Sequence, residues 1–320
     1  MIGAGPRHAA IDDMSRPKQV YTLLKETVSD WLDDKAARLA AALAFYTLLS
    51  LAPVLVLAVS IAGLVFGEEA ARGEIAGQLQ GLLGAQGAEA IQSVLANAKS
   101  PASGILGTIV GLVVLLFGAS GVFGELQGAL DIVWEVEPKK GRGVKGFLRD
   151  RFFSFTLVLG VGFLLLVSLV LSAGLAAAGA YLSNHLPGGA VLWQVVNFAI
   201  SLAVLTILFA LIFKVVPDVK IHWRDVWIGA LVTAALFTLG KFAIGLYLGR
   251  SSVGSPFGAA GSVVVLVVWV YYSAQILFFG AEFTQVYARH HGSRIEPSKN
   301  AVKVAPEAQS QLGNPAGDPV

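Results

Sequence analysis

The chain has 320 residues, of which 55% are hydrophobic and 14% are charged, and its mean hydropathy is +0.70. A soluble domain carries about 25% charged residues, so this composition excludes a water-soluble globular protein and predicts an all-α integral membrane protein, since isolated strands would leave backbone groups unpaired in lipid. The absence of cysteine excludes disulfides and thiolate metal sites, and the formal net charge of +2 is informative only through the placement of the charges.

The first two segments of the chain are polar. Residues 1–17 have no regular pattern and no apolar signal-peptide region, so we expect them to be disordered. Residues 18–38 place apolar side chains such as Val20, Leu24 and Trp31 at helical spacing, with charged residues between them. This pattern predicts an amphipathic helix that lies on the membrane surface before the first span.

The middle of the chain, residues 39–290, is a series of apolar stretches. A helix needs about 20 apolar residues to cross the hydrocarbon core. Six stretches meet this requirement and predict a bundle of about six transmembrane helices, at about 39–66, 104–125, 152–180, 191–216, 225–248 and 258–286. Residues 291–320 are rich in Pro, Gln, Gly and Asn, so we expect a disordered tail.

The basic residues alternate sharply between successive connections. Nineteen lysines and arginines lie in the N-terminal segment, in 126–151, in 214–224 or in the tail. The other three connections hold only Arg72, Lys99 and Arg250. Because basic residues favour the cytoplasmic side of a membrane, we predict that both termini are cytoplasmic.

Small residues mark the faces on which helices are expected to pack. On a helix of 3.6 residues per turn, one face of the second span gathers Gly107, Gly111, Gly118, Gly121, Glu125 and Gly128. A glycine face lets another helix approach closely, which points Glu125 at a neighbouring helix. Gly280 permits the same close approach in the last span.

Polar side chains within or beside the spans form the candidate site. They are Glu125, Glu282, Gln275, Arg38 and Lys241. Gln275 and Glu282 share a stripe of the last span with Arg289, and Glu282 is expected close to Glu125 and to a cation from Arg38 or Arg151. Lys241 lies deeper, about 25 Å along the fifth span, away from both glutamates. Two roles stay open for these groups, the handling of protons or ionic headgroups and the packing of helix ends.

Catalytic and cofactor motifs find no support in the sequence. The five histidines form no HExxH or other zinc pattern, so we predict no metal site and no catalytic residues. "GRGVKG" at 141–146 matches a dinucleotide motif, but it lies between two spans instead of between a strand and a helix, so no cofactor is expected. The basic loops lack the aromatic platforms of RNA-binding modules, and no nucleic-acid partner is predicted.

Three stretches together resemble the YihY family of bacterial inner-membrane proteins, also called the virulence factor BrkB family. They are "ARLAAALAFYTLLSLAPVLVL" at 37–57, "KVVPDVKIHWRDVWIGA" at 214–230 and "SPFGAAGSVVVLVVWVYYSAQILFFGAEFTQVYA" at 255–288. The resemblance implies a six-span protein of the bacterial inner membrane. It also implies a link to envelope integrity and to lipid export, and it supplies no catalytic residues.

Three functions are compatible with these features. The first is the transport or flipping of an envelope lipid or other amphiphile, which with six spans would require a homo-oligomer or a lateral groove. The second is a scaffold that maintains the envelope without transport. The third, a membrane-associated ribonuclease, would need a metal site that the sequence does not supply. Membrane lipids are the expected partners in the first case.

Overall fold

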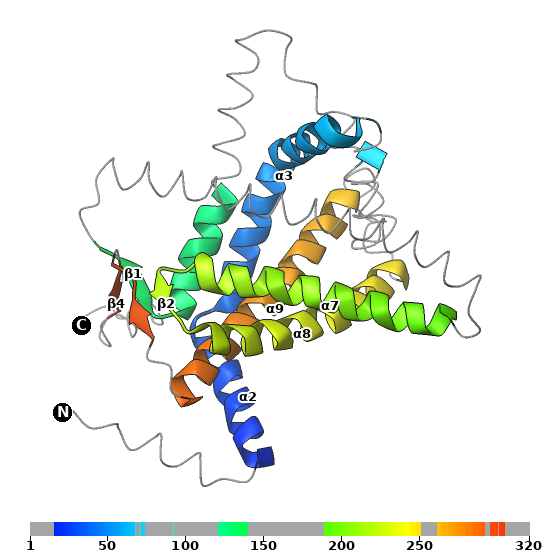
Figure 1. The fold of residues 1–320 in the computed structure, drawn as a ribbon. Coiled ribbons are helices and arrows are strands. Elements are labelled where there is room, and N and C mark those ends of the chain that lie inside the picture. Colours follow the sequence, from blue (N-terminus) through cyan, green and yellow to red (C-terminus); the bar gives the residue numbers. More distant parts are fainter. Residues whose placement is uncertain are drawn as a thin grey trace, which may run out of the picture.

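The computed structural model describes residues 16–67, 121–139, 189–250, 261–291, 295–299 and 301–304, with the single residues 69, 72, 73 and 92. This part of the chain is mostly helical, which confirms the predicted helical membrane protein (Figure 1). The predicted span at 152–180 and residues 104–120 of the second span lie outside the described residues. So do residues 1–15 of the predicted disordered N-terminus.

The amphipathic segment forms helix α2, Arg16–Asp33, which ends five residues before its predicted end. The chain then bends at Lys35, whose left-handed φ of 53° interrupts the helix, and α3 runs over Ala36–Phe66. A non-glycine residue with positive φ is uncommon. The bend separates the polar helix from the apolar one and positions Asp34 between them.

The second predicted span continues past Glu125. Residues 121–133 are helical, and the turn at Trp134 and Glu135 leads into β1, Val136–Pro138. Leu126, Leu130, Val133 and Trp134 are all buried. Their helical spacing explains why the helix extends beyond the point at which the uninterrupted apolar stretch ends.

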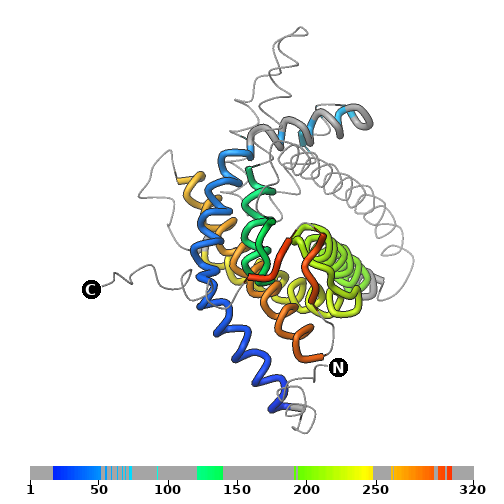
Figure 2. Tube along the Cα trace, turned by 90° about the vertical axis from the view of Figure 1, so that its left-hand side faces the viewer, coloured from blue at the N-terminus to red at the C-terminus, as the bar shows by residue number. Residues whose placement is uncertain are grey.

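Three long helices match the last three predicted spans. They are α7, Gly189–Val215, α8, Trp223–Arg250, and α9, Gly261–His291. Among the described residues, each of these helices contains a segment long and apolar enough to cross a membrane, and Ala36–Leu51 is a shorter apolar stretch. Helix α8 packs between α7 and α9, and α9 also packs against α3 and α2 (Figures 1 and 2).

Small residues bring α8 and α9 together, as expected for Gly280. A Cβ added at Gly280 would lie 2.0 Å from the Thr233 Oγ1, and one at Gly229 would lie 1.8 Å from the Thr284 Oγ1. Each threonine hydroxyl donates to the carbonyl oxygen of the glycine four residues earlier, so Thr233 bonds Gly229 and Thr284 bonds Gly280. The two helices therefore interlock through two glycine–threonine contacts. In one contact the glycine belongs to α8 and the threonine to α9, and in the other the glycine belongs to α9 and the threonine to α8.

The glycine face of the second span is only partly retained. A Cβ at Gly121 would lie 3.3 Å from Cδ1 of Tyr46 on α3, which places this glycine at a helix contact. Gly128 was expected on the same face, but a Cβ there would meet nothing within 4 Å. Gly107, Gly111 and Gly118 lie outside the described residues.

The prediction of a disordered tail is wrong for residues 295–299 and 301–304. Strand β3, Glu296–Pro297, pairs antiparallel with β2, Val219–Lys220, and β4, Ala301–Lys303, pairs antiparallel with β1. The unpaired backbone edges of two loops supply partners that local composition cannot reveal. Helix α9 also extends to His291, beyond the predicted end of the last span.

The four basic-rich segments meet at one end of the bundle. The strand pairs join the tail to the segments that follow residue 133 and residue 215, and α2 lies beside the C-terminal part of α9 (Figures 1 and 2). The described parts of all four basic-rich segments therefore lie at this end of the molecule.

Candidate functional site

A pair of carboxyl groups, the buried Glu282 and the half-buried Asp34, meets where α9 approaches the junction of α2 and α3. The Glu282 side chain is 1% exposed and is hydrogen-bonded to the Asp34 side chain. Two carboxyl groups can form such a bond only when they hold a proton between them, because two carboxylates are both acceptors. The pair is therefore a place where one proton is bound inside the protein.

The surroundings of Asp34 favour its protonated form. Burial raises the pKa of Asp34, the hydrogen bond from Glu282 lowers it, and the negative charges of Asp30, Glu135 and Asp33 raise it again, to about 6. Loss of hydration disfavours the charged carboxylate, and like charges nearby act in the same direction. Asp34 therefore changes its charge close to neutral pH.

A cluster of ion pairs closes the site at its polar end. The Arg289 Nη2 lies 2.6 Å from the Asp30 Oδ2 and 3.7 Å from the Glu26 Oε2, and the Arg289 Nη1 lies 4.0 Å from the Glu135 Oε1. The His290 Nε2 lies 2.5 Å from the Glu26 Oε2. Exposed pairs of this kind contribute little free energy individually, but together they join α2, α9 and the turn at Glu135.

Two strained backbone positions flank the acidic groups. Lys35 and Glu135 have φ angles of 53° and 54°. Among the described residues these are the non-glycine positions with positive φ, and they adjoin Asp34 and Arg289 respectively. Such conformations cost about 1–3 kcal/mol and are often found at functional sites.

The candidate site predicted from the sequence is only partly assembled. The charges that act on Glu282 are Asp34, Asp30 and Arg289. Glu282 is thus not paired with Arg38, which is exposed, and Glu125 is half-buried and is not among these groups. Arg151, the other predicted cation, lies outside the described residues.

Lys241 is not among the charged groups that act on Asp34 or Glu282. It lies in α8, and its Nζ is 5.8 Å from the centre of the Phe242 ring. The sequence reasoning missed Asp34, Asp30 and Glu135 as members of the site. Acidic residues at the end of an amphipathic helix look like a solvated face, and only the bend at Lys35 turns Asp34 toward α9.

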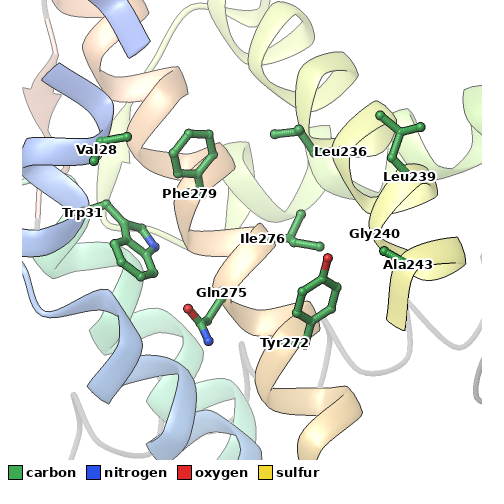
Figure 3. Close-up of a pocket in the computed structure, with 10 residues that line it drawn as sticks. All are labelled: Val28, Trp31, Leu236, Leu239, Gly240, Ala243, Tyr272, Gln275, Ile276 and Phe279. Carbon is green, nitrogen blue, oxygen red and sulfur yellow. The ribbon is translucent and has the colours of Figure 1, made fainter. Parts of the chain in front are cut away.

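An open groove lies beside the carboxyl pair. Its cavity has a volume of about 490 Å³ and is lined by α2, α8 and α9 through Val28, Trp31, Leu236, Leu239, Gly240, Ala243, Tyr272, Gln275, Ile276 and Phe279 (Figure 3). Leu239 is 68% exposed, so the groove opens to the outside of the bundle. Its volume falls within the range of about 300–1,000 Å³ that is typical of small-molecule sites.

The few polar groups of the groove belong to Trp31, Tyr272 and Gln275. The Trp31 Nε1 is buried, and in the part of the chain that is described it has no hydrogen-bond partner. Figure 3 shows Trp31 on α2 and Gln275 on α9, while Tyr272 and Ile276 extend toward Gly240. A ligand that is mostly apolar and carries a hydrogen-bond acceptor near Trp31 would match this lining.

The carboxyl pair lies close in sequence to two residues that line the groove, although neither carboxyl group lines it. Trp31 precedes Asp34 by three residues and Phe279 precedes Glu282 by three. Residues three apart on a helix are neighbours, so Phe279 lies next to Glu282 on α9, while Asp34 lies in the turn that follows α2. Within the described ranges, no group of three or more histidine, aspartate or glutamate side chains is arranged to hold a metal ion.

Comparisons with known proteins give a consistent result. The model of the family described as "Virulence factor BrkB" matches residues 27–305. The chain is 30% identical over 251 residues to a UPF0761 membrane protein of Verminephrobacter eiseniae (strain EF01-2), covering 77% of this chain and 57% of that protein. It is 23% identical over 284 residues to a UPF0761 membrane protein of Psychrobacter sp. (strain PRwf-1), and this match covers 84% of this chain and 51% of that protein.

A third relative, a UPF0761 membrane protein of Yersinia pseudotuberculosis serotype O:3 (strain YPIII), is 28% identical over 204 residues, covering 62% of this chain and 65% of that protein. The chain spans little more than half the length of the first two relatives. No solved structure matches it.

Proposed function

The chain belongs to the virulence factor BrkB family of membrane proteins, and from this premise we propose that it binds a membrane lipid or a similar amphiphile in the groove between α2, α8 and α9 and moves it between leaflets. The observation that carries the proposal is an apolar groove that is open to the outside, two of whose lining residues, Trp31 and Phe279, each precede a member of the carboxyl pair by three residues. An acyl chain fits the apolar lining, and a polar headgroup fits the end at Trp31.

The carboxyl pair supplies the polar step in this proposal. A headgroup that enters the groove meets Trp31 first and then Asp34 and Glu282, one helical turn further on. Release of the shared proton would leave a charge in a poorly hydrated place, so the bound ligand and the proton affect each other's affinity. The direction of movement would then depend on pH.

The setting of this function is also a proposal. We place the protein in the bacterial inner membrane, with the end that holds α2 and the tail in the cytoplasm, because nineteen basic residues belong to the segments at that end. Membrane lipids are the proposed partners, and a homo-oligomer would complete a longer path. No nucleic acid, cofactor or chemical reaction forms part of the proposal. Reporter fusions after residue 90 and at the C-terminus test the orientation.

Leaflet exchange in liposomes tests the function directly. The purified protein is reconstituted with a trace of phospholipid that carries a fluorescent headgroup, and a membrane-impermeant reductant removes the fluorescence of the outer leaflet. We expect continued loss of fluorescence at a rate above that of protein-free liposomes. A rate equal to that of protein-free liposomes would contradict transport and favour a scaffold.

A matched pair of variants tests the groove. A Cβ at Gly240 would lie 2.6 Å from the Ile276 Cδ1 and 3.0 Å from the Tyr272 hydroxyl, so Gly240→Leu displaces these side chains into the cavity. Gly245 lies on the same helix with nothing within 4 Å of its added Cβ, and Gly245→Leu is the control. We expect exchange to fall in the first variant only. Equal exchange in both would place the path outside this groove.

A further inference from the structure

A second pocket lies in the connection between α7 and α8. Its volume is about 370 Å³, and its lining consists of Lys214, Lys220, Ile221, His222, Trp223 and Glu296. We call it the loop pocket. It shares no lining residue with the groove, and it is formed by the end of α7, strand β2, the start of α8 and one residue of β3.

The loop pocket lies between two helices that are long and apolar enough to cross a membrane. The two candidate spans that adjoin it are Gln194–Val215, which ends next to Lys214, and Trp223–Tyr247, which begins at Trp223. The pocket therefore lies where two apolar spans meet the polar region, at the level of lipid headgroups. Trp223 and Trp227 are 47% and 43% exposed with ring centres 6.4 Å apart, and exposed tryptophan is typical of this level.

The charge of the pocket favours an anion. Its lining has two lysines and one glutamate, Glu296, which is the Cα partner of Lys220 in the β2–β3 register. In the described part of the chain, no carboxylate lies within 4.0 Å of the Lys214 or Lys220 ammonium group. The basic charge of the pocket is thus not neutralised by a direct ion pair.

Lys214 is held in place without an anionic partner. Its Nζ donates to the Ile221 carbonyl oxygen and lies 5.7 Å from the centre of the Trp223 ring. An ammonium group has three donors, so the bond to Ile221 leaves two N–H groups for a ligand. The side chain is half-buried and fixed, which reduces the conformational entropy lost when an anion binds.

We propose that the loop pocket binds the phosphate of an anionic phospholipid headgroup. Lys214 and Lys220 contact the phosphate oxygens, His222 offers a further hydrogen bond, and Trp223 packs against the glycerol region of the lipid. Basic pockets at the ends of membrane helices are suited to such headgroups. The site is independent of the transport proposed above, because it uses none of the groove residues.

Lipid-selective quenching tests the site. The protein is reconstituted in phosphatidylcholine vesicles that contain increasing fractions of phosphatidylglycerol with brominated acyl chains, which quench nearby tryptophan. Brominated phosphatidylcholine is the reference. We expect stronger quenching by phosphatidylglycerol than by phosphatidylcholine at equal fractions. In the double variant Lys214→Gln/Lys220→Gln, the preference for phosphatidylglycerol should fall about fivefold for each lysine removed.

A matched control separates the pocket from general surface charge. Lys18→Gln/Lys25→Gln removes the same charge from exposed positions on α2 and should keep the preference of the wild type. If the double variant at the pocket fails to fold, Lys220→Gln alone carries the test, since that side chain is exposed. A preference that survives the loss of both lysines, or that falls equally in the control, would overturn the proposal.

The source of the phosphate is tested in the same vesicles. Inorganic phosphate is added to the wild type and compared with chloride at equal ionic strength. Because the proposed contacts are made to the phosphate group, inorganic phosphate should compete with the lipid and lower the preference more than chloride, which acts through screening alone. Equal effects of the two salts would contradict recognition of a phosphate group. If the wild type shows no preference for phosphatidylglycerol but binds labelled inorganic phosphate through the two lysines, the pocket binds a free anion and the lipid assignment is wrong.

Discussion

The hydrogen bond between Glu282 and Asp34 joins a buried side chain to a half-buried one. Glu282 comes from α9, and Asp34 is brought to it by the left-handed Lys35. The Glu282 Oε1 is buried and, within the described residues, unpaired. The site therefore has one free acceptor oxygen next to the shared proton. A free acceptor favours a role in proton exchange or in binding a polar ligand over a role in helix packing alone.

Substitutions at Glu282 separate these two roles. Gln has almost the same shape and can donate from its amide to Asp34, so Glu282→Gln should melt close to the wild type. Glu282→Leu leaves Asp34 without its donor and should lower the free energy of unfolding by about 1–3 kcal/mol. Thermal melting in detergent measures both. If the two variants melt at the same temperature, the hydrogen bond does not contribute to stability.

The same pair of variants tests the proposed function. Glu282→Gln removes the exchangeable proton, and leaflet exchange should fall although the protein remains folded. Normal exchange in folded Glu282→Gln would limit the carboxyl pair to a structural role.

The raised pKa of Asp34 predicts a specific pH dependence. The folded protein holds the Asp34 proton up to a pH of about 6, whereas an unfolded aspartate loses it near 4. The stabilising contribution of this group is therefore complete below pH 4 and is lost as the pH rises through 6. Asp34→Asn cannot lose a proton, so its melting temperature relative to that of the wild type should rise between pH 4 and pH 7.

The other charged groups around Asp34 are the same in both proteins, so the difference between the two melting curves reports on the Asp34 carboxyl group. Those that face it are Asp30, Asp33, Glu135 and Glu282, with Arg289 beyond them. A constant difference in melting temperature across the pH range would show that Asp34 is not titrating where its surroundings place it.

At the scale of elements, the α8–α9 contact is the most constrained feature. Gly229, Thr233, Gly280 and Thr284 form two contacts in which a threonine fills the space left by a glycine. The threonine hydroxyls bond within their own helices, so each side chain has little freedom to turn away. Close packing of this kind replaces the hydrophobic effect, which is absent between helices in lipid.

Gly280→Ala is expected to damage this contact. The new methyl group would lie 2.0 Å from the Thr233 Oγ1, so the helices must separate, at a cost of about 1–3 kcal/mol typical of overpacking. Gly245→Ala adds the same methyl group to α8 with nothing within 4 Å and serves as the control. Purified yield and melting temperature measure the effect. Equal values for the two variants would contradict the interlocked contact.

Sequence patterns predicted the helices better than the partners of individual residues. The lengths of the apolar stretches predicted the ends of α7, α8 and α9 to within about five residues. This worked because a membrane span is defined by the hydrophobicity of its own residues. Arg38, one of the two cations expected for Glu282, is exposed and is not among the groups that act on it, while Arg151 lies outside the described residues. The residue that meets Glu282 is Asp34, and its position depends on a backbone bend at Lys35 that no local pattern predicts. Gly128 shows the same limit, since a helical wheel gives a face and not the neighbour that covers it.

At the scale of the whole molecule, the tail connects segments that are far apart in the sequence. The Ser298 hydroxyl donates to the Asp218 carboxylate at 3.1 Å, and the Ser298 backbone N–H donates to the Asp218 carbonyl oxygen at 2.8 Å. The Lys139 Nζ donates to the Lys299 carbonyl oxygen at 2.8 Å. The tail therefore fixes the connection that carries the loop pocket and the turn that carries Glu135, and both candidate sites depend on it.

Truncation of the tail tests this connection. A chain that ends at residue 294 lacks β3 and β4, so β1 and β2 lose their partners and the two connections can open locally. We expect trypsin to cleave it faster than the full chain at Lys139 and Lys220, and we expect a lower melting temperature. A chain that ends at residue 304 keeps both strand pairs and should behave as the full chain does. If the two truncated chains are cleaved at the same rate at these lysines, the strands do not hold the connections, and the order of the two sites must come from the helices alone.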